Sequence, residues 1–223
     1  GNVLVGKNNQ DALCVIANEN FIVAVVCDGC GSGAHSEVGA QIGVKLVAQK
    51  FVHHISYLGL KGLLARPTDY SSAWEKTRQD VLAQIRILAN TMGQSLSQTI
   101  TDYFLFTIVG AIIAREQSFV FSLGDGTYSI NSDQLFEIGP FPNNEPPYLA
   151  YAITGSSMIN ADPELIHFDI LNASPLPGHI LIGSDGVKDL VKAEVRLIPG
   201  TANLVGPISQ FWQNDSYFTN SDA

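Results

Sequence analysis

The order of the apolar segments along the chain constrains its fold more than any other feature. Two short apolar runs, residues 12–17 and 21–27, are separated by a turn-like Asn-Glu-Asn and predict a pair of strands. Residues 36–53 and 72–92 repeat apolar side chains at helical spacing and predict two helices. Strand-like runs then return at residues 104–114, 118–123, 128–131, 148–153, 165–171 and 180–183. This order predicts an α+β fold in which the helices pack on a sheet or a pair of sheets.

Local signals refine the expected helices and loops. Ser36 stands at the start of the first helical segment as a predicted N-cap, because its hydroxyl can accept from a free backbone N–H. Gly39 and Gly43 either weaken that helix or mark the close approach of another element. Residues 58–70, which contain two glycines and a proline, predict a loop, and residues 140–147 predict a surface loop.

The charge balance excludes some classes of partner. The chain has 12 Lys and Arg against 21 Asp and Glu, which gives a net charge of −9. A nucleic-acid-binding surface needs clustered basic residues, so no nucleic-acid partner is expected. A phosphorylated substrate would have to be captured locally, by a metal or a few cations, against a repulsive overall field. Hydrophobic residues make up 46% of the 223 and charged residues 15%, which predicts an ordered domain.

No segment of the sequence resembles a membrane span or a secretion signal. The longest apolar stretch, residues 103–114, is about a dozen residues long, and a spanning helix needs about 20. We therefore expect a cytoplasmic protein with no membrane partner. The cysteines Cys14, Cys27 and Cys30 are too few for a disulfide framework. Cys27 and Cys30 form a C-x-x-C motif, but no second cysteine pair completes a zinc site. We therefore favour two structural cysteines, one on a buried strand and one in a loop, over a zinc or redox role.

Three aspartates each follow a short apolar strand and precede a glycine. They are Asp28, Asp125 and Asp185. A single Asp-Gly is more often a turn, but three at strand ends would bring mutually repelling carboxylates to the rim of one core. Mg²⁺ or Mn²⁺, which prefer oxygen ligands, would relieve that repulsion. Asp11 stands immediately before the first strand and would add a fourth carboxylate at the same edge.

The motifs around these aspartates resemble those of the protein phosphatase 2C family. Residues 28–40 read DGCGSGAHSEVGA and are similar to the family's D-G-x-G-x-G…E-x-(A/G) segment. Gln10-Asp11 resembles the start motif of a bacterial branch in which Gln-Asp replaces the commoner Glu-Asp. Residues 105–111 resemble the Thr-bearing central strand, 124–126 the Gly-Asp motif, and 183–189 the S-D-G-(hydrophobic)-x-D motif. Each motif is weak alone, but together they keep the family order and cover most of the chain.

The resemblance implies an α+β fold, a four-layer α-β-β-α sandwich with two central antiparallel β-sheets. It also implies two Mn²⁺ or Mg²⁺ ions, with Asp28 bridging both, the Gly29 carbonyl touching one and Asp185 holding the other. Asp125 stands where some members have a carboxylate near a third ion, and Asp11 would orient water or a metal. The implied activity is hydrolysis of phosphoserine and phosphothreonine in protein substrates by a water held between the metals.

Several positions depart from the family pattern. Gly6 replaces a phosphate-binding arginine, and the neighbouring Lys7 is the candidate substitute, as a point charge rather than a bidentate fork. Gln10 stands where most members have a glutamate ligand, and its uncharged amide oxygen should bind a cation more weakly. The usual general-acid histidine is missing, and His35 is the nearest candidate to protonate the leaving oxygen. For Lys7 and His35 the alternative is a solvated surface side chain.

The closing motif of the family is not found. It is an Asp-Asp or Asp-Asn pair followed by a hydrophobic strand, and neither Asp215 nor Asp222 is followed by one. Asp189 is not a replacement, because it is expected on a short helix after Asp185. We therefore expect a single phosphatase 2C-like domain over residues 1–223 without its C-terminal strand and the ligand beside it.

Three functions fit these observations, and the first is favoured. An active metal-dependent serine/threonine phosphatase explains why clustered carboxylates, which are costly without a cation, are present. A phosphatase-like regulatory or binding module without catalysis would explain Gly6, Gln10 and the displaced histidine. Another metal-dependent phosphoesterase, acting on nucleotides or small phosphoesters, is disfavoured by the motif order. The physiological substrate and the oligomeric state are left open.

Overall fold

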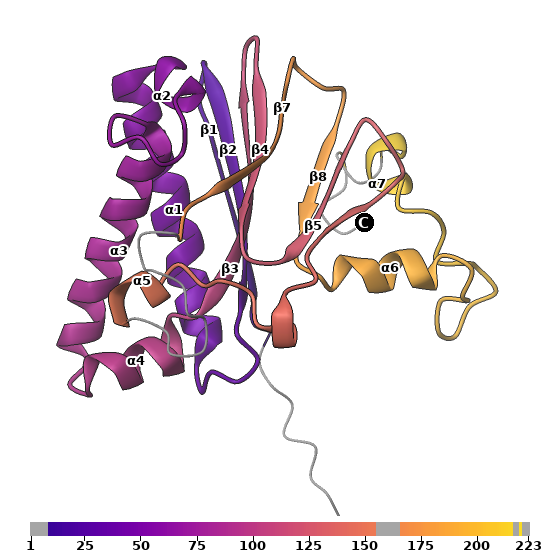
Figure 1. Cartoon of the computed structure of the whole chain (residues 1–223). Coiled ribbons are helices and arrows are strands. Elements are labelled where there is room, and N and C mark those ends of the chain that lie inside the picture. Colours follow the sequence, from indigo (N-terminus) through magenta and orange to yellow (C-terminus); the bar gives the residue numbers. More distant parts are fainter. Residues whose placement is uncertain (1–8, 155–165, 216–218, 220–223) are drawn as a thin grey trace, which may run out of the picture.

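Two antiparallel β-sheets lie face to face in the computed structural model, which describes residues 9–154, 166–215 and 219 (Figure 1). The larger sheet has the strand order β1-β2-β3-β4-β7. Its strands are β1 (Asp11–Ala17), β2 (Phe21–Gly29), β3 (Phe106–Ala114), β4 (Ser118–Leu123) and β7 (Asp169–Ser174). The smaller sheet has the order β6-β5-β8, formed by β5 (Gly126–Ile130), β6 (Phe136–Ile138) and β8 (Ile180–Gly183).

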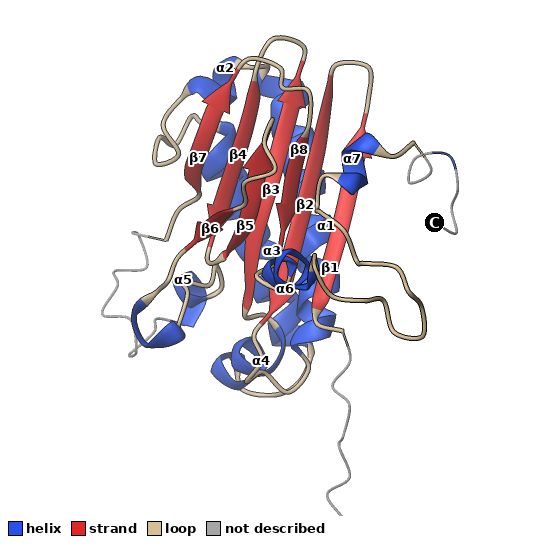
Figure 2. Cartoon of the chain, turned by 90° about the vertical axis from the view of Figure 1, so that its right-hand side faces the viewer, coloured by secondary structure: helices blue, strands red, loops and turns tan. Residues whose placement is uncertain are grey.

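Helices lie on the outer side of each sheet, and the two long ones cover the larger sheet (Figure 1). The long helices α1 (Ser36–Leu58) and α3 (Ala73–Thr91) pack on the larger sheet, as Figure 1 shows. On the side of the smaller sheet that faces away from the larger one lie α6 (Val187–Ala193) and α7 (Gln210–Gln213) (Figure 1 and Figure 2). Shorter helical segments lie in the connections between these elements: α2 (Lys61–Leu64), α4 (Leu96–Tyr103), α5 (Tyr151–Thr154) and a 3₁₀ turn, Pro142–Asn144. The predicted α+β sandwich with two antiparallel sheets is confirmed.

The core between the helices and the larger sheet follows from the alternation of side chains along β2. Phe21, Val23, Val25 and Cys27 are buried against the helices, while the residues between them face the smaller sheet. The strands β3 and β4 are buried almost throughout, because helices cover one face and the smaller sheet the other. In the described part of the chain no helix is long and apolar enough to cross a membrane.

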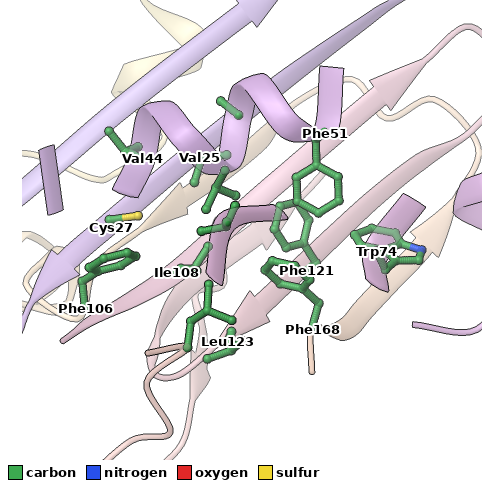
Figure 3. Close-up of a cluster of buried hydrophobic side chains, with 14 of the residues drawn as sticks. Val25, Cys27, Val44, Phe51, Trp74, Phe106, Ile108, Phe121, Leu123 and Phe168 are labelled. Atoms are coloured by element: carbon green, nitrogen blue, oxygen red, sulfur yellow. The ribbon is translucent and has the colours of Figure 1, made fainter. Parts of the chain in front are cut away.

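An aromatic cluster joins the two long helices to the sheet (Figure 3). Phe51 of α1 lies 4.9 Å from Phe121 of β4 and 5.2 Å from Trp74 of α3, measured between ring centroids. Phe168, just before β7, completes the cluster 5.3 Å from Phe51. Offset and edge-on aromatic contacts at these distances stabilise a core beyond the area that they bury.

Some predicted elements were wrong. Residues 148–153 form a turn and the helix α5 instead of a strand, because a short buried apolar run fits either structure. Helix α4 was not predicted, although Ser95 caps it by accepting from the backbone N–H of Gln98. Its eight residues are too few for a clear helical period. Residues 140–147 are not only a surface loop, because Glu145 and Pro146 line the cavity described below.

The first helix also differs from its prediction at both ends. His35 is the N-cap residue and makes no capping side-chain bond, whereas Ser36 is the first helical residue and is fully buried. The helix continues to Leu58 and ends at Gly59, whose φ of 64° suits glycine. Ser72, in contrast, caps α3 as an acceptor from the backbone N–H of Glu75.

The two glycines inside α1 mark close packing. A Cβ on Gly39 would lie 1.6 Å from the Tyr103 carbonyl oxygen at the end of α4. A Cβ on Gly43 would meet the ring of Phe106 at 2.3 Å. The start of α1 can therefore approach α4 and β3 only because these positions lack side chains.

Candidate metal and phosphate site

Three neighbouring strands place polar side chains side by side at one end of the larger sheet. In the strand register Asp11 of β1 lies opposite Asp28 of β2, and Asp28 lies opposite Thr107 of β3. Directly opposed residues of antiparallel strands point to the same face. The three side chains therefore form a row on the face that is turned away from α1 and α3.

Asp125 and Asp185 come to the same place from the ends of other strands. Asp125 lies in the tight connection from β4 to β5, between Gly124 at φ 98° and Gly126 at φ 149°. These backbone angles favour glycine, so the sequence Gly-Asp-Gly allows the chain to pass directly from one sheet to the other. Asp185 follows β8 and precedes α6, which begins at the lower end of the smaller sheet in Figure 1.

A cavity of about 710 Å³ lies between these strand ends. It is lined by Gln10, Asp28, Gly29, Asp125 and Asp185, which are the residues expected to hold metals. Asp11 is exposed and does not line the cavity, but it lies against Asp28.

The electrostatics of Asp28 reflect this crowding. Burial, followed by the charges of Asp11, Asp185 and Asp125, raises the pKa of Asp28 to about 7. A side-chain hydrogen bond with Asp11 adds to the increase, because two facing carboxylates are stable when they share a proton. Without a cation, Asp28 therefore keeps its proton up to about neutral pH.

Asp125 is perturbed in the same direction but has compensating partners. Burial and the charge of Asp185 raise its pKa, whereas Lys188 and a hydrogen bond with Thr107 oppose the increase. Lys188, on α6, also pairs with Glu137 at 3.1 Å between Nζ and Oε2. None of the described residues that line the cavity is Lys, Arg or His.

The far wall of the cavity was not predicted as part of the site. It is formed by α4, the 3₁₀ turn and α5, through Ser97, Thr101, Glu145, Pro146, Tyr148, Tyr151 and Thr154. Tyr148 also makes a side-chain hydrogen bond with Cys30, which lies in the loop after Asp28. Burial raises the pKa of the Cys30 thiol, but hydrogen bonds with Ser32 and Tyr148 outweigh it and lower that pKa. All three cysteines are free. The sequence did not point to Tyr148 and Tyr151 as part of the site, because their segment was predicted as a strand.

Of the two weaker candidates, the structure describes only His35. His35 is exposed and lies against Tyr103, with 4.9 Å between ring centroids, and is not among the residues that line the cavity. Lys7, Gly6 and Asp222 lie outside the described residues. Asp189 lies on α6, as expected, and pairs with Lys192.

The donors at this site fit a hard divalent cation. They are three carboxylates, one amide side chain and the carbonyl of Gly29, and all of them can offer oxygen. A Cβ on Gly29 would lie 2.7 Å from the Ser36 carbonyl oxygen, so only glycine fits where this carbonyl is presented. In the described part of the chain no three His, Cys, Asp or Glu side chains form a ready metal cluster.

Comparisons with known structures agree with this arrangement. Two forms of a bacterial serine phosphatase, in each of which one arginine has been replaced, are 17% identical to this chain, with TM-scores of 0.52 and 0.50. The first match covers 87% of this chain and 79% of that one, and the second 83% and 74%. The serine/threonine phosphatase Stp1 from Staphylococcus aureus is 16% identical, with a TM-score of 0.48 over 88% of this chain and 79% of that one. At 17% identity, the likeness to the two forms of the bacterial serine phosphatase shows the fold.

The family follows from the sequence itself. A comparison with curated protein sequences gives no match. The family model for protein phosphatase 2C, however, matches residues 2–214, which is nearly the whole chain. This match contains every motif that surrounds the cavity, from Gln10 to Asp189. The chain therefore belongs to the protein phosphatase 2C family.

Proposed function

We propose that this protein is a metal-dependent serine/threonine phosphatase and that residues 1–223 form one catalytic domain. Its substrates would be phosphoserine and phosphothreonine in other proteins, and its ions two Mn²⁺ or Mg²⁺, with Asp125 as a further carboxylate for a third. The observation that carries the proposal is the meeting of Asp28, Asp125 and Asp185 in one cavity, together with the raised pKa of Asp28. Carboxylates arranged at such an electrostatic cost are retained where a cation compensates them.

Each residue then has a distinct task. Asp28, the backbone carbonyl of Gly29 and Asp185 would hold the ions through their oxygen atoms. Gln10 would add a neutral oxygen. Asp11, which lies opposite Asp28 in the strand register, would orient a water or an ion at the site.

The bound ions would lower the pKa of water and neutralise charge on the phosphoryl oxygens. The chain's own contribution is to hold the oxygen ligands on rigid strand ends, so that little reorganisation is needed. Lys7 would contact the phosphate, and His35 would protonate the leaving oxygen if the loop before α1 brings it closer. Since a general acid contributes about 10²–10⁴ in rate, activity could persist without His35.

The test is hydrolysis of a phosphothreonine peptide and of p-nitrophenyl phosphate with Mn²⁺ and with EDTA. Activity is expected with Mn²⁺ only, and Asp185→Asn should reduce it by at least about a hundredfold, because a ligand's charge is lost while its shape is kept. Asp189→Asn is the matched control, since Asp189 lies four residues further along, is exposed and pairs only with Lys192 among the ion pairs of the described residues.

The same experiment separates the alternatives. Mn²⁺ binding without hydrolysis of either substrate would contradict the phosphatase and indicate a phosphatase-like binding module. The neutral Gln10 and the lack of a basic residue among the described cavity walls favour that second candidate. Faster hydrolysis of free nucleotides than of phosphopeptides would indicate another phosphoesterase.

A further inference from the structure

The side chain of Gln10 is held from behind by two hydrogen bonds. Gln10 lies one residue before β1 and lines the cavity. Its Nε2 donates to Ser36 Oγ at 2.5 Å and to the Cys30 carbonyl oxygen at 3.3 Å. The amide is therefore tied to the loop after Asp28 and to the first residue of α1.

The chemistry of these partners decides which amide atom faces them. A backbone carbonyl can only accept, so the group facing the Cys30 oxygen must be the NH₂. Ser36 Oγ donates its own proton to the same carbonyl at 2.8 Å, and therefore accepts from Gln10. This network leaves Oε1 as the Gln10 atom that is available to the cavity.

The anchor itself is rigid. Ser36 is fully buried, and its Cβ lies 2.9 Å from where a Cβ on Gly29 would stand. The Cys30 carbonyl also accepts from the backbone N–H of Gly33 at 2.9 Å. Neither Ser36 nor this carbonyl can move away without disturbing the end of β2, where Gly29 lies, and the loop that follows it.

We propose that Ser36 is a positioning residue that holds Gln10 with Oε1 turned toward the metal site. The inference rests on the proposed metal-dependent function and explains how an uncharged side chain can serve where a glutamate is usual. It also means that the pocket around residue 10 is built for an amide. A glutamate there would direct one carboxylate oxygen at the Cys30 carbonyl, and two acceptors would face each other.

The test is Mn²⁺ affinity, measured by isothermal titration calorimetry on the unchanged chain and on Ser36→Ala, Gln10→Ala and the double variant. Ser36→Ala is expected to weaken binding about tenfold, which is the scale reported for groups that orient a ligand. Because Ser36 acts through Gln10, adding Ser36→Ala to Gln10→Ala should not weaken Mn²⁺ binding any further. Gln10→Glu should bind Mn²⁺ no more tightly than the unchanged chain, despite its added charge.

Ser72→Ala is the matched control. Ser72 is also a fully buried serine whose hydroxyl accepts a hydrogen bond, here from the backbone N–H of Glu75 at 3.0 Å. This variant should lower the melting temperature and leave Mn²⁺ affinity unchanged. A purely structural role for Ser36 would make both variants behave alike.

The outcomes distinguish this inference from the proposed function. Unchanged Mn²⁺ affinity in Ser36→Ala, with binding abolished by Asp28→Asn, would overturn the positioning role alone. Tighter binding by Gln10→Glu would also overturn it, and since Gln10 is only half-buried this variant serves even if Ser36→Ala does not fold. A failure of the unchanged chain to bind Mn²⁺ would overturn both proposals.

Discussion

At the scale of single residues, Asp28 concentrates the electrostatic cost of the site. It lies between Asp11 and Thr107 in the strand register and faces Asp125 and Asp185 across the cavity. Its pKa of about 7, raised from 3.8, means that the metal-free folded chain binds a proton which the unfolded chain releases at lower pH. The sheet therefore holds a carboxylate in a position that becomes favourable once a positive charge is bound.

This shift predicts how the stability of the metal-free protein depends on pH. Between about pH 4 and pH 7 the folded state holds more protons than the unfolded state, so the free energy of unfolding falls as pH rises through that window. Thermal melts in EDTA should show the melting temperature decreasing from pH 5 to pH 7.5, and Mn²⁺ should reverse the decrease. In Asp28→Asn this pH dependence should be reduced, with a remainder from Asp125, whose pKa is also raised, and a variant that kept the full slope would contradict the assignment to Asp28.

At the scale of elements, the approach of α1 to α4 depends on Gly39. Alanine favours an isolated helix over glycine by about 1 kcal/mol, so propensity alone predicts that Gly39→Ala stabilises the protein. The contact with the Tyr103 carbonyl oxygen predicts the opposite, a loss of about 1–3 kcal/mol in the free energy of unfolding. Urea denaturation decides the sign, with Gly31→Ala as control because no atom would lie within 4 Å of its Cβ.

The start of α3 carries a buried ionic cluster. Glu75 is only 3% exposed, pairs with Arg78 at 2.6 Å between Oε2 and Nε, and accepts from Gln79 at 2.7 Å. The Nδ1 atom of His167, before β7, lies 3.3 Å from the same carboxylate, so the cluster ties the helix to the edge of the larger sheet. Burial alone would raise the pKa of Glu75, but the bonds from Arg78 and Gln79 lower it overall.

Glu75→Gln should therefore destabilise the fold by about 1.5–3 kcal/mol near neutral pH, the usual scale for hydrogen bonds to a charged group. Because the folded pKa is lowered, this contribution is present above the usual glutamate value and is lost as pH falls through the folded pKa. The difference in the free energy of unfolding between the unchanged chain and Glu75→Gln, measured by urea denaturation, should therefore decrease at acidic pH. Lys192→Gln, which breaks an exposed pair, should change stability by less than about 1 kcal/mol.

At the scale of the whole molecule, the net charge of −9 opposes the approach of anionic substrates. Raising the salt from about 50 to 300 mM should screen that repulsion, so KM for an acidic phosphopeptide should fall severalfold. A phosphopeptide with basic flanking residues and no net charge is the control and should show little change. An increase of KM with salt for the acidic peptide would instead indicate a local cationic binding surface.

Much of this arrangement is readable from local sequence. The alternation along Phe21–Gly29 and the Asp-Gly pairs after apolar runs depend on neighbouring residues only. They therefore predicted most of the strands, the α+β class and the three aspartates that line the cavity, and the motif order indicated the family. That Asp28, Asp125, Asp185 and Gln10 bind metal stays a prediction.

Other features were decided only by the tertiary structure. The pairing of Asp11 with Asp28 and the raised pKa that results depend on strand register and burial, which no single segment encodes. Tyr148 became part of the site wall because its segment folds as a turn and helix α5 against the helices. Ser36 became a partner of Gln10, 26 positions away, because the start of α1 packs on the loop after Asp28. Long-range contacts of this kind arise from packing, so local periodicity predicts the parts of the site but not the contacts between them.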